Sequence, residues 1–165
     1  MTIVMVEGKS DRVALEVCAR RLGLAIPTIV AIGGAHAAAR AVASVREEAP
    51  HERIVGLVDA GEQRAFAKVI DPVFVCNRDL EDELIRALGI EATLSVIEQQ
   101  GELGSFGTLR KQPAYRDHDI INQLRQFLHG RSGNKARYAA LFAEAIDLDR
   151  IPAPVRETLA AATES

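Results

Sequence analysis

The 165-residue sequence predicts an α/β protein: a parallel sheet of about four strands flanked by helices, followed by a helical C-terminal extension. Short apolar segments alternate with helical segments through the first 90 residues, and this alternation is typical of parallel sheets. The connections between successive apolar segments are long enough for right-handed crossovers. Past residue 89 the apolar residues recur only at helical spacing. We expect the strand order 2-1-3-4, which places the first and third strands side by side.

The first half of the chain contains four predicted strands and four predicted helices. The first helix has an apolar face that includes Leu15 and Leu22, and Gly23 ends it. Pro27 opens the second strand, where a missing backbone donor is tolerated. A Gly-Gly pair separates this strand from an alanine-rich helix whose small side chains permit close packing on the sheet. The predicted strands are residues 2–6, 27–32, 53–58 and 71–76, and the predicted helices are residues 10–23, 35–48, 62–69 and 80–88.

The second half of the chain is predicted to be helical. A helix is expected over residues 90–100, then an irregular segment over 101–113, where glycines recur, and a short last helix over 155–162. Two more apolar faces at helical spacing begin at Ile120 and at Tyr138. These faces either pack internally or form the contact of a homodimer.

Length and composition favour one soluble globular domain. No apolar run approaches the ~18–20 residues that cross a bilayer, so no membrane partner is expected. The N-terminus carries no secretory signal pattern, and Cys18 and Cys76 lack metal-type spacing, so we expect a reducing, cytoplasmic setting. We divide the chain into an α/β core, residues 1–90, and a helical C-terminal extension, residues 91–165, packed on or beside the core.

Charge is unevenly distributed along the chain. Residues 1–100 carry 11 Lys and Arg against 15 Asp and Glu, whereas residues 101–140 carry 7 against 3. A bound metal ion would offset the acidic part, and a phosphate backbone would be attracted by the basic part. Solvated helix faces explain the basic segment equally well.

Acidic residues stand directly after three of the predicted strands. Glu7 follows the first strand, Asp59 the third, and Asp79 and Glu81 come after the fourth. Parallel strands deliver the residues that follow them to the carboxyl edge of the sheet, where open α/β sheets bind ligands. Carboxylates gathered there repel one another unless a cation lies between them. The sequence therefore predicts a divalent-metal site for phosphate chemistry.

Several of these acids also have a purely structural interpretation. Asp11 is placed to favour the dipole of the first helix, with Ser10 as the N-cap. Asp79 is placed to cap the fourth helix, with Glu81, Asp82 and Glu83 as acids of its first turn. The structural interpretation is weaker for the two acids that close buried strands, since a buried carboxylate is costly unless paired. No single arginine is an obvious partner for either of them.

Three motifs resemble those of the Toprim domain, and more specifically the Toprim domain of the overcoming-lysogenization-defect (OLD) nucleases. They are Glu7-Gly8-x-x-Asp11, Asp59-x-x-Glu62 and Asp79-Leu80-Glu81-Asp82-Glu83. The resemblance spans nearly the whole chain and includes Ser132-Gly133-Asn134-Lys135-Ala136-Arg137-Tyr138, which is similar to that family's lysine-bearing helix start. It implies a Rossmann-like Toprim fold and Mg²⁺- or Mn²⁺-dependent cleavage of DNA. OLD nucleases usually carry an ATPase domain, but this chain has no Walker A loop, so an ATPase partner would be separately encoded.

Carried over position by position, the resemblance implies a catalytic set and a wider metal-binding set. The catalytic residues are Glu7, Asp59, Glu81 and Lys135, with the lysine stabilising transition-state charge. The metal-binding residues are Glu7, Asp11, Asp59, Glu62, Asp79, Glu81 and Glu83. The chain departs from the usual Asp-x-Asp pattern by having Gly61 after Asp59-Ala60. Glu62 either replaces the missing acid or is only a helix-start acid, which would leave a weakened site.

Basic residues are the expected contacts to nucleic acid: Lys9, Arg110, Lys111, Arg131 and Arg137. An isolated lysine at a helix start is usually solvated, so Lys135 acquires its role from the resemblance alone. The four histidines share no metal spacing and are expected at the surface. The alternative to a nuclease is a non-catalytic or weakly catalytic module that binds nucleic acid or an ATPase. A phosphatase or nucleotidyl transferase is a third possibility.

Overall fold

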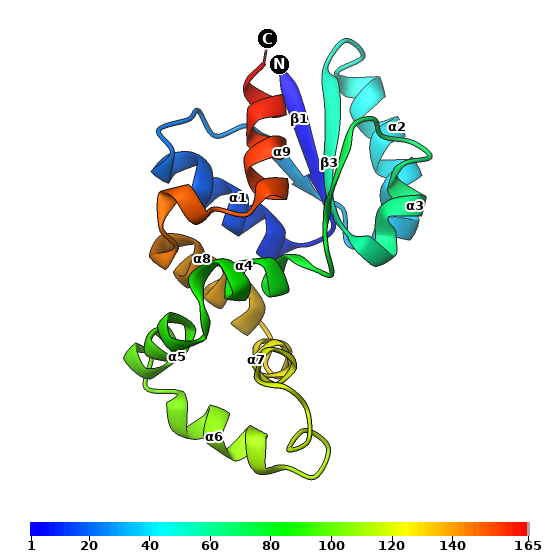
Figure 1. Ribbon diagram of the computed structural model, residues 1–165. Helices are drawn as coiled ribbons and strands as arrows, with labels where there is room; N and C mark the ends of the chain where they lie inside the picture. The colour runs from blue at the N-terminus through cyan, green and yellow to red at the C-terminus, as the bar shows by residue number, and fades with distance from the viewer. Residues whose placement is uncertain (165) are drawn as a thin grey trace.

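The computed structural model describes residues 1–164 and contains a parallel sheet with strand order β2-β1-β3-β4 (Figure 1). Val6 pairs with Leu57 across β1 and β3, and Asp59 pairs with Cys76 across β3 and β4. The predicted strand order and the α/β fold class are confirmed. The strands are β1 Thr2–Val6, β2 Thr28–Ala31, β3 Arg53–Asp59 and β4 Val73–Cys76.

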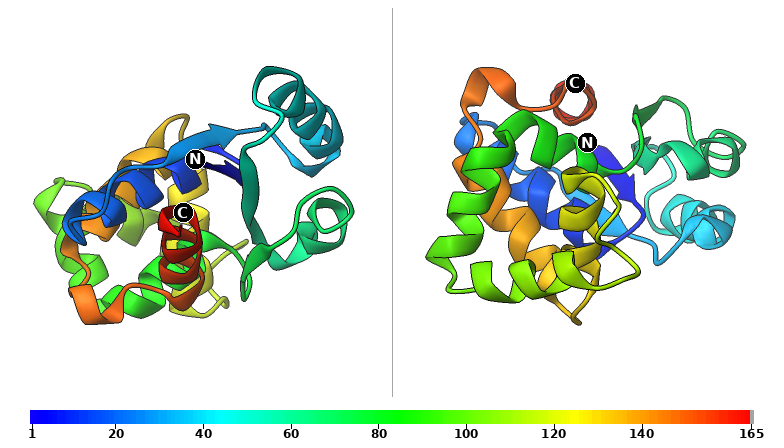
Figure 2. Two further views of the ribbon diagram at one scale, coloured as in Figure 1. Left: turned by 90° about the horizontal axis from the view of Figure 1, so that it is seen from above. Right: turned by 60° about the horizontal axis from the view of Figure 1, so that its bottom comes forward.

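Helices cover both faces of this sheet, because alternate strand residues are apolar on each side (Figure 2). On one face, Met5 and Val58 pack with Phe66 in a cluster under α2 (Ala38–Glu48) and α3 (Gln63–Phe66). On the other face, Val4 and Leu57 join the larger core beneath α1 (Lys9–Arg21) and α9 (Ala153–Thr163). Short 3₁₀ turns, η1 (Ala35–Ala37), η2 (Ala60–Glu62) and η3 (Leu148–Arg150), complete the connections.

The C-terminal helices are attached to the core through α1. Helix α8 (Asn134–Ala145) packs along α1, and the Arg21 guanidinium donates to the carbonyl oxygens of Ala143 and Ile146, both at 2.6 Å. Helix α9 then returns the chain to the sheet, and its end lies beside the N-terminus (Figure 1).

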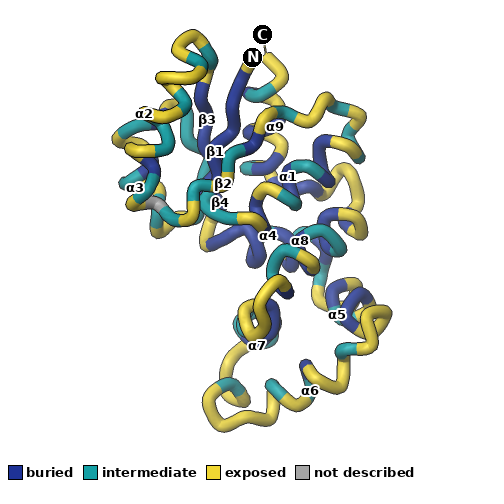
Figure 3. Tube along the Cα trace, turned by 180° about the vertical axis from the view of Figure 1, so that it is seen from behind, coloured by how far each residue is buried: buried dark blue, intermediate teal, exposed yellow. Residues whose placement is uncertain are grey.

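Three helices form a lobe beyond α4 (Leu80–Leu88) and α8 (Figure 3). They are α5 (Ile90–Gln99), α6 (Leu103–Lys111) and α7 (Ile120–His129). Within the lobe, the ring centroids of Phe106 and Phe127 lie 5.5 Å apart, and Phe127 also connects the lobe to α8, with its centroid 5.9 Å from that of Tyr138. None of the helices in the described chain is long and apolar enough to span a membrane.

Two predicted elements differ from the structure. The segment 101–113, expected to be irregular, contains helix α6. Its glycines have poor helix propensity, but Phe106 is 1% exposed against Phe127, and this tertiary packing outweighs propensity. The helix predicted over 62–69 is shorter: residues 60–62 form the 3₁₀ turn η2, α3 spans Gln63–Phe66, and the chain then turns, with the N–H groups of Val69 and Ile70 both donating to the Phe66 carbonyl oxygen.

Candidate functional site

The carboxyl edge of the sheet brings the predicted acids close together. Glu7 directly follows β1, and Asp59 is the last residue of the neighbouring strand β3. The N-cap and the first turn of α4 supply Asp79 and Glu81, which are 7% and 2% exposed. These carboxylates influence one another's ionisation, as described below, and together we call Glu7, Asp11, Asp59, Asp79 and Glu81 the acidic centre.

Glu7 has a carboxylate oxygen that lacks a partner. Its Oε2 atom is buried, and no hydrogen-bond donor reaches it in the described part of the chain. Burial raises the pKa of Glu7, and the nearby charge of Glu62 raises it further. An ionised oxygen in such a position is costly, so a cation bound there would be favoured.

Asp11 combines a structural and an electrostatic role. It lies in the first turn of α1 and its Oδ2 accepts a hydrogen bond from the Gly8 backbone N–H at 2.8 Å. Gly8 is therefore the N-cap, not Ser10 as predicted, and the Asp11 side chain binds the backbone N–H of this N-cap residue. Burial, followed by the charge of Glu81, raises the pKa of Asp11 to about 6.

Asp59 lies at the end of β3, and its pKa is raised further than that of Asp11. Burial, together with the nearby charges of Asp11 and Glu7, raises the pKa of Asp59 to about 7. Glu7, Asp11 and Asp59 therefore place negative charge close together, and hydrogen-bond donors of the protein balance this charge only in part.

Asp79 and Glu81, in contrast, have internal cationic partners. Asp79 caps α4 by accepting from the Asp82 backbone N–H at 2.8 Å, and the Arg125 guanidinium binds both of its oxygens. Burial acts to raise the pKa of Asp79, but the bonds from Arg125 and Asp82 outweigh it and lower the pKa. The structural interpretation of Asp79 as an N-cap is therefore correct, whatever else the residue does.

Lys135 is the cation within the acidic centre. Helix α8 begins at Asn134, and the Lys135 Nζ atom lies 3.3 Å from Glu81 Oε1. Burial lowers the pKa of Lys135, but the charges of Glu81 and Asp11 raise it and prevail. Lys135 is thus a half-buried ammonium group held among carboxylates and not a solvated lysine.

The remaining predicted acids occupy different positions. Glu62 is half-buried in η2, and its charge acts on Glu7. Glu83 accepts a hydrogen bond from the Asn77 backbone N–H at 2.8 Å, so one of its oxygens already stabilises the β4–α4 loop. Asp82 forms an ion pair with Arg86 on the same helix, at 2.6 Å.

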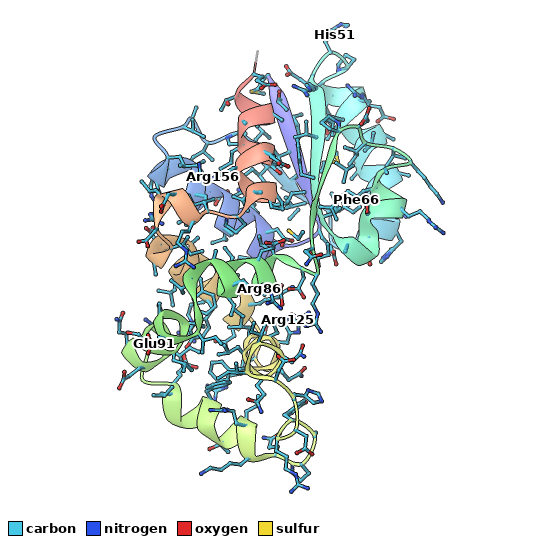
Figure 4. All side chains as sticks on the ribbon, viewed as in Figure 1. His51, Phe66, Arg86, Glu91, Arg125 and Arg156 are labelled. Atoms are coloured by element: carbon cyan, nitrogen blue, oxygen red, sulfur yellow. The ribbon has the colours of Figure 1, made fainter. Side chains whose placement is uncertain are left out.

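Arg125 is a residue of this site that sequence reasoning missed. It lies on α7 (Figure 4), and its guanidinium reaches Asp79 at the start of α4. Asp79 is 46 positions away in the sequence, and no local spacing connects the two. Only the folding of the lobe against α4 brings them together.

The predicted nucleic-acid contacts lie at the start of α1, on α6, in the loop between α7 and α8, and on α8. Arg110 donates to Gln123 Oε1 at 2.9 Å, and Arg137 pairs with Glu102 while its guanidinium lies 4.6 Å from the Tyr138 ring centroid. Both therefore have internal partners. The other three side chains are exposed and form no ion pair with any described residue: Lys9, Lys111 and Arg131.

Across residues 1–164, no three His, Cys, Asp or Glu side chains are arranged to hold a metal ion as they stand. The chemistry of the donors nevertheless fits a hard divalent cation. Magnesium is bound by one or two carboxylates, with water and substrate phosphate completing its shell. Glu7, with its unpartnered oxygen, and Asp59, with its raised pKa, are carboxylates of this kind.

Asp59 makes the stability of the metal-free protein depend on pH. Because its folded pKa is raised to about 7, the folded state binds a proton that the unfolded state has lost, and stability falls as pH rises through that range. We expect Asp59→Asn, which cannot ionise, to gain stability relative to the wild type between pH 5 and pH 8. Urea denaturation in EDTA across this range measures the difference. A difference in the free energy of unfolding between the variant and the wild type that stays constant from pH 5 to pH 8 would contradict the raised pKa of Asp59.

The fold and the site together define an α/β domain with an acidic centre at the carboxyl edge of a parallel sheet. Among solved structures, the chain is similar to the C-terminal region of the Burkholderia pseudomallei OLD protein. The TM-score is 0.65, the sequence identity is 18%, and the match covers 98% of this chain and 96% of that one. Comparison with protein-family models finds no match, and comparison with curated proteins finds none. At this identity the likeness shows a shared fold.

Proposed function

We propose that this protein is a Toprim-type nuclease that hydrolyses DNA phosphodiester bonds with Mg²⁺ or Mn²⁺. The observation that carries the proposal is the unpartnered, buried Oε2 of Glu7 beside Asp59, whose pKa is raised. The likeness in fold to the OLD C-terminal region supports the choice of the Toprim class.

The charge distribution indicates where the cation would bind. Asp79 is neutralised by Arg125 and Glu81 by Lys135, so the unbalanced charge lies at Glu7, Asp11 and Asp59. Glu7 and Asp59 would hold the ion, with Glu62 adding its charge from η2. The other predicted ligands, Asp79, Glu81 and Glu83, would shape the surroundings of this position. When bound, the metal neutralises phosphate charge and lowers the pKa of a coordinated water.

Lys135 contributes charge of its own to this chemistry. Its ammonium group is held by Glu81 among the carboxylates, which fixes its position before substrate arrives. A fixed positive charge beside the phosphate would stabilise the additional negative charge of the transition state. The proposed partners are DNA and a separately encoded ATPase, and a homodimer is compatible with this assignment.

Incubation of supercoiled plasmid with the purified protein tests the proposal directly. We expect nicking in Mg²⁺ or Mn²⁺ and none in EDTA. Lys135→Met should reduce the rate about a hundredfold while a retardation assay still detects DNA binding. Absence of cleavage in both metals, with DNA still retarded, would contradict the nuclease and favour the binding module.

The binding-module alternative has one observation in its favour, which is Gly61. A side chain is absent where an aspartate is expected, but the position has space for one: a Cβ atom there would meet nothing within 4 Å. The weak point of the site is therefore the missing carboxylate and not a blocked space.

Restoring the acid should strengthen metal binding. We expect Gly61→Asp to tighten Mn²⁺ affinity about tenfold, because one more carboxylate would face an already acidic position. Gly61→Asn is the matched control, with the same size and no charge, and calorimetric titration measures both. Equal affinities for the two variants would show that residue 61 does not face the metal.

A further inference from the structure

A cleft of about 510 Å³ lies beside the acidic centre, between α7 and the loop that joins β4 to α4. Its volume is in the range of small-ligand sites. All of its lining residues are polar or charged: Arg78, Asp117, His118, Asp119, Asn122, Arg125, Gln126 and His129. A cleft of this composition suits a polar or charged ligand better than a hydrophobic one.

The cleft shares one wall with the acidic centre. Arg125 lines the cleft, and its guanidinium also binds Asp79 of the acidic centre. Arg78 immediately precedes Asp79 in the chain, and its carbonyl oxygen accepts a hydrogen bond from Ala60, the residue after Asp59. A ligand in the cleft would therefore lie next to the proposed metal position.

The carboxylates of the cleft already have partners. Asp119 caps α7 by accepting from the backbone and side-chain nitrogens of Asn122, at 2.9 and 2.6 Å. Asp117 lies 3.8 Å from Arg116. These contacts occupy the carboxylate oxygens but do not cancel their charge, and the nearby charge of Arg78 acts to offset that of Asp119.

The side chains that remain available can all donate hydrogen bonds. Within residues 1–164, no hydrogen bond or ion pair engages the side chains of Arg78, His118, Gln126 or His129. Arginine is suited to bidentate contact with phosphate, and glutamine to both donor and acceptor edges of a base. His118 lies against Tyr115, with ring centroids 6.0 Å apart, and offers a flat ring for stacking.

We propose that this cleft binds one nucleotide of the substrate strand beside the bond to be cleaved, with Arg78 contacting its phosphate. This assignment rests on the proposed nuclease function and adds a specific subsite to it. In this assignment the nucleotide lies among the donors Arg78, His118, Gln126 and His129, and the bond to be cleaved lies on the side of Arg125 that faces the acidic centre.

A mononucleotide titration tests the subsite without any cleavage. Thymidine 5′-monophosphate is added to the full chain in EDTA, and the ring signals of His118 and His129 are followed by NMR. We expect both signals to shift, and thymidine, which lacks the phosphate, to bind more weakly. Arg78→Gln should weaken binding of the monophosphate about tenfold. Arg150→Gln, an exposed arginine in η3, is the matched control and should titrate like the wild type.

Two outcomes would overturn the assignment. One is the absence of shifts at both histidines, and the other is an Arg78→Gln variant that binds as the wild type does. Thermal unfolding of the variant checks that it is folded. Plasmid nicking by the wild type reports separately on the nuclease. If the protein nicks plasmid but the histidine signals do not shift, only the nucleotide subsite is rejected. If the signals shift but no nicking occurs, only the nuclease is rejected.

Discussion

Glu7→Gln is expected to reduce metal-dependent cleavage at least a hundredfold while the protein remains folded. Glutamine has the shape of glutamate but no charge, so the variant loses the negative charge that would bind the cation. A hundredfold loss corresponds to about 2.7 kcal/mol of transition-state stabilisation, within the range of a metal contribution. Plasmid nicking in Mn²⁺ measures the effect, and calorimetric titration of Mn²⁺ measures the accompanying loss of affinity.

The same variant should be more stable than the wild type when metal is absent. The pKa of Glu7 is raised by burial and by Glu62, so its ionised form is disfavoured in the folded protein, and removing the charge relieves this. Thermal unfolding in EDTA at pH 8 gives the comparison. Glu91→Gln is the matched control, since Glu91 is exposed on α5 away from the site (Figure 4). Cleavage by Glu7→Gln at nearly the wild-type rate would contradict the site assignment.

Arg125→Met is expected to lower the free energy of unfolding by about 3 kcal/mol at pH 7. The substitution leaves the Asp79 carboxylate, which is 7% exposed, without its cationic partner. Removing one member of a buried pair typically has this effect, because the other charge stays buried and uncompensated. Urea denaturation followed by circular dichroism measures the loss.

Two comparisons identify the ion pair as the cause. Adding Asp79→Asn to Arg125→Met should recover part of the lost stability, because the unpaired charge is then removed. The folded pKa of Asp79 is lowered, so the stabilisation is present above its unfolded pKa and disappears as pH falls through the folded pKa. The difference in the free energy of unfolding between the wild type and Arg125→Met should therefore become smaller below about pH 4. A loss under 0.5 kcal/mol at pH 7 would contradict the buried pair.

Much of the fold was predictable because its signals are local. The alternation of apolar and helical segments determines the parallel sheet, and the order β2-β1-β3-β4 places the residues after β1 and β3 at one edge. The gathering of Glu7 and Asp59 follows from that order. Helix α6 was not predictable, because its glycines argue against a helix and its stability comes from Phe106 packing on Phe127, a contact between separate elements.

The electrostatics of the site were only partly predictable. That acids would gather at the edge follows from the sequence, but their internal partners do not. Arg125 reaches Asp79 and Lys135 reaches Glu81 only because α7 and α8 fold back against α4, and no spacing in the sequence encodes such contacts. The distinction between neutralised and unbalanced carboxylates, on which the proposed metal position depends, requires the three-dimensional structure.

The two ends of the described chain lie side by side, as Figures 1 and 2 show. Arg53, at the start of β3, lies 3.9 Å from Glu164 and donates to the carbonyl oxygen of Ala161, while the Met1 amino group pairs with Glu52. Both ends are thus at the amino edge of the sheet, opposite the acidic centre. A short linker could join them, and new termini opened in a loop of the lobe would give a circular permutant with an unchanged sheet edge.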